Sequence, residues 1–179
     1  MNYLPLLPTY LYLFPTEFLP TVDKSNLETK FADSKKRLVD LKDITSLILA
    51  VTLSTLKKKG LLLIQGNGNI TFLKKIKDGG GSNLEVLLLK QIDVNSQNLE
   101  EVIKKINEEK IMDLVKADLV ASEVLVTKKN LLGKEEIAPS PAKVTLLASQ
   151  LPQVTEELEK LKADHLFLEV LAQTKKAMD

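Results

Sequence analysis

The first twenty residues are the most apolar stretch of the chain, yet they carry prolines at positions 5, 8, 15 and 20. Because proline interrupts both helical and sheet hydrogen bonding, this stretch cannot form one continuous helix or cross a membrane. It also lacks the cationic start of a secretory signal, so we expect a cytoplasmic chain. We expect residues 1–24 to form an extended apolar arm packed on a domain. The alternative is a wedge that enters a membrane interface or a groove on a partner.

The large apolar side chains of this arm are the candidate contacts with a partner or a membrane. They are Tyr3, Leu6, Leu7, Tyr10, Tyr12, Phe14 and Phe18. The rest of the chain, residues 25–179, is expected to fold as a single helical domain. A length of 179 residues suggests one domain, and 44% hydrophobic with 27% charged residues is the balance of an ordinary globular protein.

The residue types present narrow the function classes. The chain has no cysteine, which removes disulfides, thiolate metal sites and cysteine nucleophiles. Its single histidine, His165, could act as a general base, but no serine or second histidine is placed to work with it, and a surface position on the last helix is the better interpretation. We therefore expect no enzyme, no catalytic residue, no cofactor and no metal site. With 25 Lys and Arg against 24 Asp and Glu, the net charge of +1 gives no general attraction to nucleic acid or to an anionic membrane. Any such attraction has to be local.

Capping signals predict where the helices begin. Ser25 and Glu28 have the spacing of a capping box, which predicts a helix that runs to about Leu38. Asp43 is the expected N-cap of a second helix that stops before Gly60. Apolar residues at helical spacing predict further helices over 84–92 and 111–119, and between them a helix that is capped by Ser96 or Asn98 and runs to Ile106. Helical spacing returns from residue 142, is interrupted at Pro152, and predicts a last helix over 154–177.

Two hairpins are expected between these helices. The apolar runs 61–64 and 70–73 flank Asn67-Gly68, a dipeptide that supports the positive φ of a tight turn. A second, smaller hairpin is expected to pair residues 124–127 with Leu131-Leu132, followed by a Pro/Ser-rich linker. We therefore expect a mainly α fold with small β-hairpins. It comprises tandem winged-helix-like units at about 43–73 and 98–132, followed by a C-terminal helical segment at about 142–178.

Three stretches together resemble the Golgi phosphoprotein 3 family of peripheral membrane proteins. They are LILAVTLSTLKKKGLLLIQGNGNITFL (47–73), SNLEVLLLKQI (82–92) and IMDLVKADLVASEVLVTKKNLLG (111–133). The resemblance implies a mostly helical globule that binds phosphoinositide head groups and holds client proteins at a membrane. The stretch 43–92 is also similar to a family of bacterial membrane-protein cytosolic domains with paired winged helices.

The chain departs from the Golgi phosphoprotein pattern at the lipid pocket. That family uses a tryptophan and arginines, whereas this chain has no tryptophan and only Arg37. Glu109 and Met112 lie where two of the arginines belong, and the nearby Lys110 lacks the bidentate fork of an arginine. This chain can therefore share the fold of that family without sharing its recognition of lipids.

Lysine clusters are the candidate lipid- or anion-binding residues. They are Lys57, Lys58 and Lys59, then Lys74 and Lys75, with Lys110 beside the implied lipid pocket. The simpler interpretation is that these lysines only solvate the ends of helices and strands. In a winged-helix unit one helix would read the bases, and here these helices would be residues 44–56 and 111–121. Both are too apolar and too poor in Arg, Asn and Gln to read base edges, so nucleic acid is not an expected partner.

These observations lead to two hypotheses for the function. The first is a non-catalytic peripheral membrane or adaptor protein that binds anionic lipid head groups. The alternative is a structural or scaffold subunit of a larger assembly, docked through its N-terminal arm. We expect a protein partner, and leave an anionic membrane surface and a homo-oligomer open.

Overall fold

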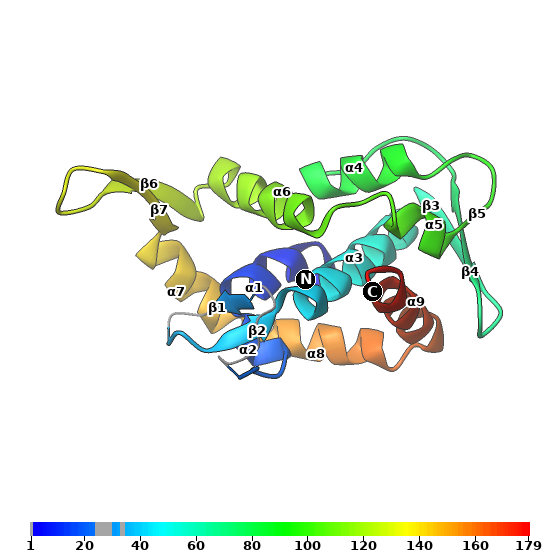
Figure 1. The fold of residues 1–179 in the computed structure, drawn as a ribbon, viewed down its shortest axis with the longest axis horizontal. Coiled ribbons are helices and arrows are strands. Elements are labelled where there is room, and N and C mark those ends of the chain that lie inside the picture. Colours follow the sequence, from blue (N-terminus) through cyan, green and yellow to red (C-terminus); the bar gives the residue numbers. More distant parts are fainter. Residues whose placement is uncertain (1, 24–29, 33–34) are drawn as a thin grey trace.

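The computed structural model describes residues 2–23, 30–32 and 35–179 (Figure 1). The protein is a mixed α/β structure in which helices predominate and the described strands form small antiparallel sheets. The mainly α class that we expected is therefore too narrow. Figure 1 shows helices gathered in the middle, a β-hairpin projecting at one end and a small sheet at the other. Among the described helices, none combines the length and the apolar character needed to span a membrane.

Helix α3 (Leu41–Lys58) forms the centre of the core, with side chains buried almost continuously from Ile44 to Leu56. Its N-cap is Asp40, whose carboxylate accepts a hydrogen bond from the Lys42 amide at 2.9 Å. The prediction of Asp43 as the cap was wrong by one turn. The helix stops as predicted at Gly60, which has a φ of +70° that favours glycine.

The N-terminal arm is helical, which corrects the expectation of an extended segment. It forms a 3-10 turn η1 (Leu4–Leu6) and helices α1 (Leu7–Leu13) and α2 (Pro15–Phe18). Each of these elements has a proline in its first turn, where the missing N–H has no helical partner to lose. The arm packs on the domain, because α1 contacts α3 and buries side chains in the common core.

A short antiparallel pair, β1 (Lys30–Ala32) and β2 (Leu38–Asp40), precedes α3. The predicted helix ending near Leu38 was wrong over these strands, while its capping box at Ser25 and Glu28 lies outside the described residues. Lys36 has a φ of +59°, a backbone conformation that does not continue a right-handed helix.

The first hairpin is confirmed and consists of β3 (Leu62–Gly66) and β4 (Thr71–Lys75), joined by a turn that contains Gly68 at a φ of +89°. A short third strand, β5 (Gln97–Asn98), pairs with β4 and was not predicted. The predicted helices α4 (Asn83–Gln91), α5 (Leu99–Ile103) and α6 (Glu108–Ala121) follow. Their N-caps are Ser82, Asn98 and Asn107, each of which accepts a backbone hydrogen bond.

The second hairpin exists, but its second strand lies later than predicted. Strand β6 (Leu125–Lys129) pairs with β7 (Glu135–Pro139), so that Leu131 and Leu132 lie in the turn rather than in a strand. The stretch interpreted as a Pro/Ser-rich linker is β7. Its proline is tolerated because this two-stranded sheet leaves each strand an open edge.

Helices α7 (Pro141–Ser149), α8 (Leu151–Lys162) and α9 (His165–Ala177) complete the chain. The single long helix predicted over 154–177 was wrong, because the chain turns at Ala163 and Asp164. The Asp164 carboxylate accepts a hydrogen bond from the Leu166 amide at 3.0 Å and begins α9 as a new helix. Helix α9 packs along α3, and the Lys175 ammonium lies 2.7 Å from the Asp43 carboxylate.

Candidate functional sites at a hairpin tip and a pocket

The tip of the β6–β7 hairpin presents two adjacent apolar side chains to solvent. Leu131 is fully exposed, at 106% of the reference area, and Leu132 is 83% exposed. Figure 1 shows this hairpin projecting away from the helices at one end of the molecule. Apolar residues are uncommon at exposed turns, which usually carry polar side chains. Their exposure therefore marks the tip as a candidate contact surface.

The turn that carries these leucines is held by its own backbone and by Asn130. The Asn130 carboxamide oxygen accepts hydrogen bonds from the Leu132 and Lys134 amides at 2.9 and 3.0 Å. The Gly133 amide donates to the Asn130 carbonyl at 2.9 Å, and Gly133 adopts a φ of +74°. The tip is therefore a preorganised turn that positions both leucines without help from the rest of the protein.

Charged residues surround the leucine tip. Lys128 and Lys129 are exposed at the end of β6, and Lys134 is exposed in the turn. Glu135 and Glu136 lie opposite Lys129 and Lys128 in the strand register. Three ammonium groups against two carboxylates leave a net charge of about +1 on this end of the hairpin. The two exposed leucines are therefore surrounded by a weakly cationic ring of charged side chains, here called the collar. It consists of Lys128, Lys129, Lys134, Glu135 and Glu136.

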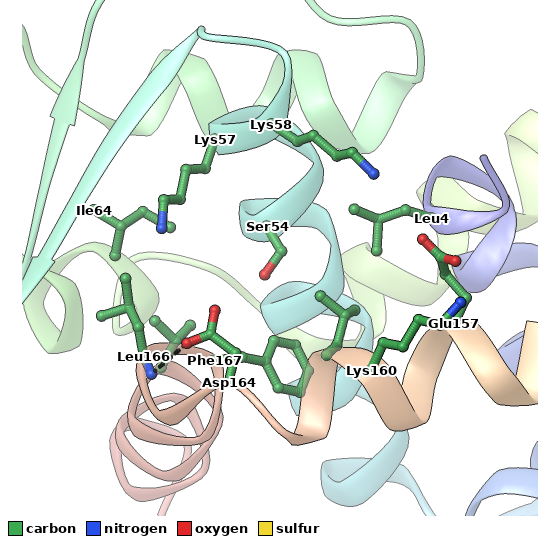
Figure 2. Close-up of a pocket in the computed structure, with 12 residues that line it drawn as sticks. Leu4, Ser54, Lys57, Lys58, Ile64, Glu157, Lys160, Asp164, Leu166 and Phe167 are labelled. Carbon is green, nitrogen blue, oxygen red and sulfur yellow. Dashed lines mark hydrogen bonds between the residues drawn. The ribbon is translucent and has the colours of Figure 1, made fainter.

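A pocket of about 370 Å³ opens between the C-terminal end of α3 and the corner where α8 meets α9 (Figure 2). Its walls are apolar side chains, most of which are buried or half-buried. They are Leu4, Ile64, Leu161, Leu166, Phe167 and Val170. Figure 2 shows the Phe167 ring and the Ser54 hydroxyl pointing into the space between the helices. The pocket thus has an apolar floor, and the Ser54 hydroxyl is one of several polar groups around it.

Three lysines line the rim of this pocket: Lys57 and Lys58 from α3, and Lys160 from α8. In Figure 2, Lys57 reaches down beside Ile64, whereas Lys58 extends toward Leu4. Among the described residues, no hydrogen bond or ion pair engages the Lys57 ammonium, and Lys58 makes only a 3.5 Å contact with the Asn2 carboxamide oxygen. Two cations are therefore available to a ligand at the opening.

Two acidic side chains, Glu157 and Asp164, also line the pocket. Asp164 caps α9, so its carboxylate faces the positive end of that helix dipole. Lys160 forms an ion pair with Glu156 at 2.9 Å. The hydrogen bond within this pair, with the opposite charge, lowers the pKa of Glu156 and raises the pKa of Lys160. Lys160 is therefore charged at neutral pH and already paired, which leaves Lys57 as the least engaged cation.

The other predicted lysines do not join this pocket. Lys59 turns to the opposite side, where its ammonium lies 2.8 and 2.9 Å from the two carboxylate oxygens of the buried Glu85. Lys74 is exposed, Lys75 pairs with Asp78 at 3.0 Å, and Lys110 is exposed in the first turn of α6. The six lysines therefore do not form one cationic surface.

The arm residues also fall into two groups. Leu7 and Tyr10 are buried in the core, and the Tyr10 hydroxyl donates to the Gln150 side-chain oxygen at 3.1 Å. Burial raises the pKa of Tyr10, with a smaller coulombic contribution from Tyr3. The remaining candidates are half-buried and pack against the core: Tyr3, Leu6, Tyr12, Phe14 and Phe18. The arm is thus largely occupied by contacts within the chain.

A second pocket, of about 480 Å³, lies beside the position where the family resemblance places the lipid site. It is lined by Glu108, Glu109 and Lys104, with Leu41 and Met178 among its apolar residues. Two carboxylates against one ammonium do not favour a phosphorylated head group. Lys110 and Met112 are not among the lining residues.

His165 is exposed at the first position of α9. Within the described ranges, no three acidic or histidine side chains gather in an arrangement that could hold a metal ion.

Sequence reasoning missed the leucine tip because Leu131-Leu132 was interpreted as a strand. The position of these leucines between Asn130 and Gly133, both typical turn residues, is the signal that could have identified a turn. Likewise, Ser82-Asn83-Leu84-Glu85 repeats the sequence at 25–28 and could have located the N-cap of α4 at Ser82, whose hydroxyl accepts a hydrogen bond from the Glu85 amide.

Comparisons of the chain with models of protein families, with curated proteins and with solved structures found no match.

Proposed function

We propose that this protein is a non-catalytic peripheral membrane protein that attaches to an anionic membrane surface through the tip of the β6–β7 hairpin. The observation that carries the proposal is the exposure of Leu131 and Leu132 on a preorganised turn. The lysine collar supports a membrane as the contact, because cations beside an inserted apolar side chain favour anionic lipids.

The magnitudes favour the leucines as the main source of affinity. Transferring one leucine side chain from water into an apolar environment contributes about 1.5–3 kcal/mol. A cation near an anionic surface contributes about 1 kcal/mol, and the net charge of the tip is only about +1. Insertion of the two leucines therefore outweighs attraction to head groups, and the attachment does not require recognition of a particular lipid.

The adaptor role that the Golgi phosphoprotein 3 resemblance implies belongs to the same proposal, with client proteins held at the membrane by the rest of the domain. Two helix-hairpin pairs, α3 with β3–β4 and α6 with β6–β7, support the interpretation as tandem winged-helix-like units. In this interpretation the wing of the second unit is the membrane anchor. Docking through the arm receives less support, because Leu7 and Tyr10 are already buried.

Co-flotation with vesicles tests the proposal. The full chain would be mixed with vesicles of phosphatidylcholine alone, of phosphatidylcholine with phosphatidylserine, and of phosphatidylcholine with a phosphatidylinositol phosphate. We expect the chain to float with both kinds of anionic vesicle. The double variant Leu131→Asp with Leu132→Asp should lose at least about tenfold in binding, because two charged groups would have to enter the interface.

The matched control is Ile70→Asp, which places a carboxylate at an exposed apolar position near the turn of the first hairpin. This variant should float like the unmodified chain. Failure of the unmodified chain to float, or equal flotation of the double variant, would contradict the proposal. A requirement for phosphatidylinositol phosphate would instead point to a specific head-group site.

A further inference from the structure

We propose that the pocket between α3, α8 and α9 binds a small amphipathic anion, a ligand with one short hydrocarbon chain that ends in a carboxylate or a phosphate. This site is separate from the hairpin tip and goes beyond membrane attachment. The charged group of the ligand would lie at Lys57 and Lys58, and its chain would lie along Phe167 and Val170.

The shape and lining of the pocket support a small molecule rather than a protein segment. Its volume of about 370 Å³ is near the lower end of the range of about 300–1,000 Å³ that is typical of small-molecule sites. Ile64, Phe167 and Val170 are buried in the core and line the pocket at the same time. They form a fixed apolar floor, and a volume of this size suits one chain better than the two chains of a membrane lipid.

The charged side chains at the rim of the pocket favour a negatively charged ligand. Lys57 lacks a partner among the described residues, while Lys160 is held by Glu156 and Asp164 is held at the start of α9. Glu157 also lines the pocket and is half-buried on α8. An anion would give the Lys57 and Lys58 ammonium groups a counter-charge. A cation would find the Asp164 carboxylate already at the positive end of the α9 dipole and the Glu157 carboxylate already in coulombic interaction with Lys160.

Ligand titrations followed by methyl NMR test this inference. The probes are decanoate and decyl phosphate, each kept below the concentration at which it forms micelles. Decanol, which keeps the chain without the charge, and acetate, which keeps the charge without the chain, are the comparison ligands. We expect both amphipathic anions to shift the methyl signals of Ile64 and Val170, with Leu131 as the remote reference. Decanol and acetate should bind at least about tenfold more weakly.

Three variants distinguish binding in the pocket from nonspecific adsorption. The double variant Lys57→Gln with Lys58→Gln should weaken binding about tenfold, because hydrogen bonds to charged groups are lost. The matched control, Lys74→Gln with Lys77→Gln, removes the same charge at exposed positions outside the pocket lining and should bind like the unmodified chain. The variant Ser54→Leu fills the wall of the pocket and should also block binding. Thermal unfolding would confirm that each variant is folded.

Several results would overturn the inference. One is an absence of shifts at Ile64 and Val170 with either anion. Another is equal affinity for decanoate and decanol, which would show that the lysines do not contribute. A third is unchanged affinity in the Lys57 and Lys58 variant. Shifts confined to Leu131 would assign the ligand to the hairpin tip and would likewise contradict binding in the pocket.

Discussion

The two larger hairpins of this protein share a turn chemistry and differ in what covers the tip. In the first hairpin the Gly68 amide donates to the Glu169 carboxylate at 3.1 Å, and the Thr71 amide donates to the Gln173 side-chain oxygen at 2.9 Å. Both acceptors belong to α9, so the tip is tied to the C-terminal helix. In the second hairpin Asn130 satisfies the turn from within, and Leu131 and Leu132 remain exposed.

The strands show the same difference. The first hairpin buries Leu62, Ile64 and Leu73 against the core, and β5 extends it to a third strand. The second hairpin is two-stranded and buries Leu125 at its base, with the rest of β6 and β7 partly or fully exposed. The comparison indicates that an Asn/Gly turn alone does not define a role. The first hairpin supports the fold, and the second presents a surface.

The largest expected effect is on stability, and it concerns the same substitution in the two hairpins. Leu73→Ala should lower the free energy of unfolding by about 2–5 kcal/mol, because it leaves a cavity in the core. Leu131→Ala should change it by less than about 0.5 kcal/mol, because the side chain is already in water. Urea unfolding followed by circular dichroism measures both. Similar losses in the two variants would show that the second tip is also packed.

The next largest effect is on membrane binding, where a substitution in the second hairpin should matter more than one in the first. Leu131→Ala should weaken vesicle binding about tenfold, since most of one inserted leucine side chain is lost. Ile70→Ala near the first turn should leave vesicle binding unchanged. Flotation or sedimentation with phosphatidylserine-containing vesicles measures the two partition coefficients. A weaker binding of the Ile70 variant would place the first hairpin in the membrane contact and would remove the distinction.

A smaller effect is expected from the groups that anchor each turn. Glu169→Gln should lower the free energy of unfolding by about 1 kcal/mol, because the charged acceptor from α9 is lost. For the same reason it should speed hydrogen exchange at the Gly68 amide. Glu136→Gln alters the corresponding contact in the second hairpin, where the Asn130 side chain donates to Glu136 at 2.6 Å in solvent. Glu136→Gln should lower the free energy of unfolding by less than about 0.5 kcal/mol. Hydrogen exchange that is unchanged at Gly68 would show that α9 does not hold the first tip.

The smallest expected effect is that of salt on membrane binding. The collar of the second tip carries a net charge of only about +1, so screening it should weaken vesicle binding by no more than about fivefold. Flotation at low and high ionic strength measures this ratio. A loss at high salt greater than the loss caused by Leu131→Ala would make lysines, rather than leucines, the main anchor.

Local signals predicted the elements whose boundaries are set by a few neighbouring residues. Asn67-Gly68 predicted the first turn, Gly60 predicted the end of α3, and Asn98 was correctly named as a candidate cap of α5. The arm was misinterpreted because its prolines were taken as breaks, although they occupy the first turns of short helices. Strand β7 was missed because Glu135-Glu136-Ile137-Ala138-Pro139 carries little apolar alternation, which fits its exposure.

The candidate sites were predicted less well because they depend on tertiary arrangement. Lys57 and Lys58 were named from sequence, but the residues that complete their pocket come from α8 and α9, about a hundred positions later. Local spacing does not specify how these helices cross. The break at Asp164 that creates the corner was hidden because apolar residues keep helical spacing on both sides of it.

The most direct test of the membrane contact uses the absence of tryptophan in this chain, which makes any introduced tryptophan a local reporter. Leu132→Trp reports on the second tip, and Phe72→Trp reports on the first hairpin at a partly exposed position. Anionic vesicles should shift the emission of the first variant to shorter wavelength, and brominated lipids should quench it, while the second variant should show neither change. An unchanged emission at position 132, or an equal shift at position 72, would contradict the assignment of the second hairpin tip as the membrane anchor.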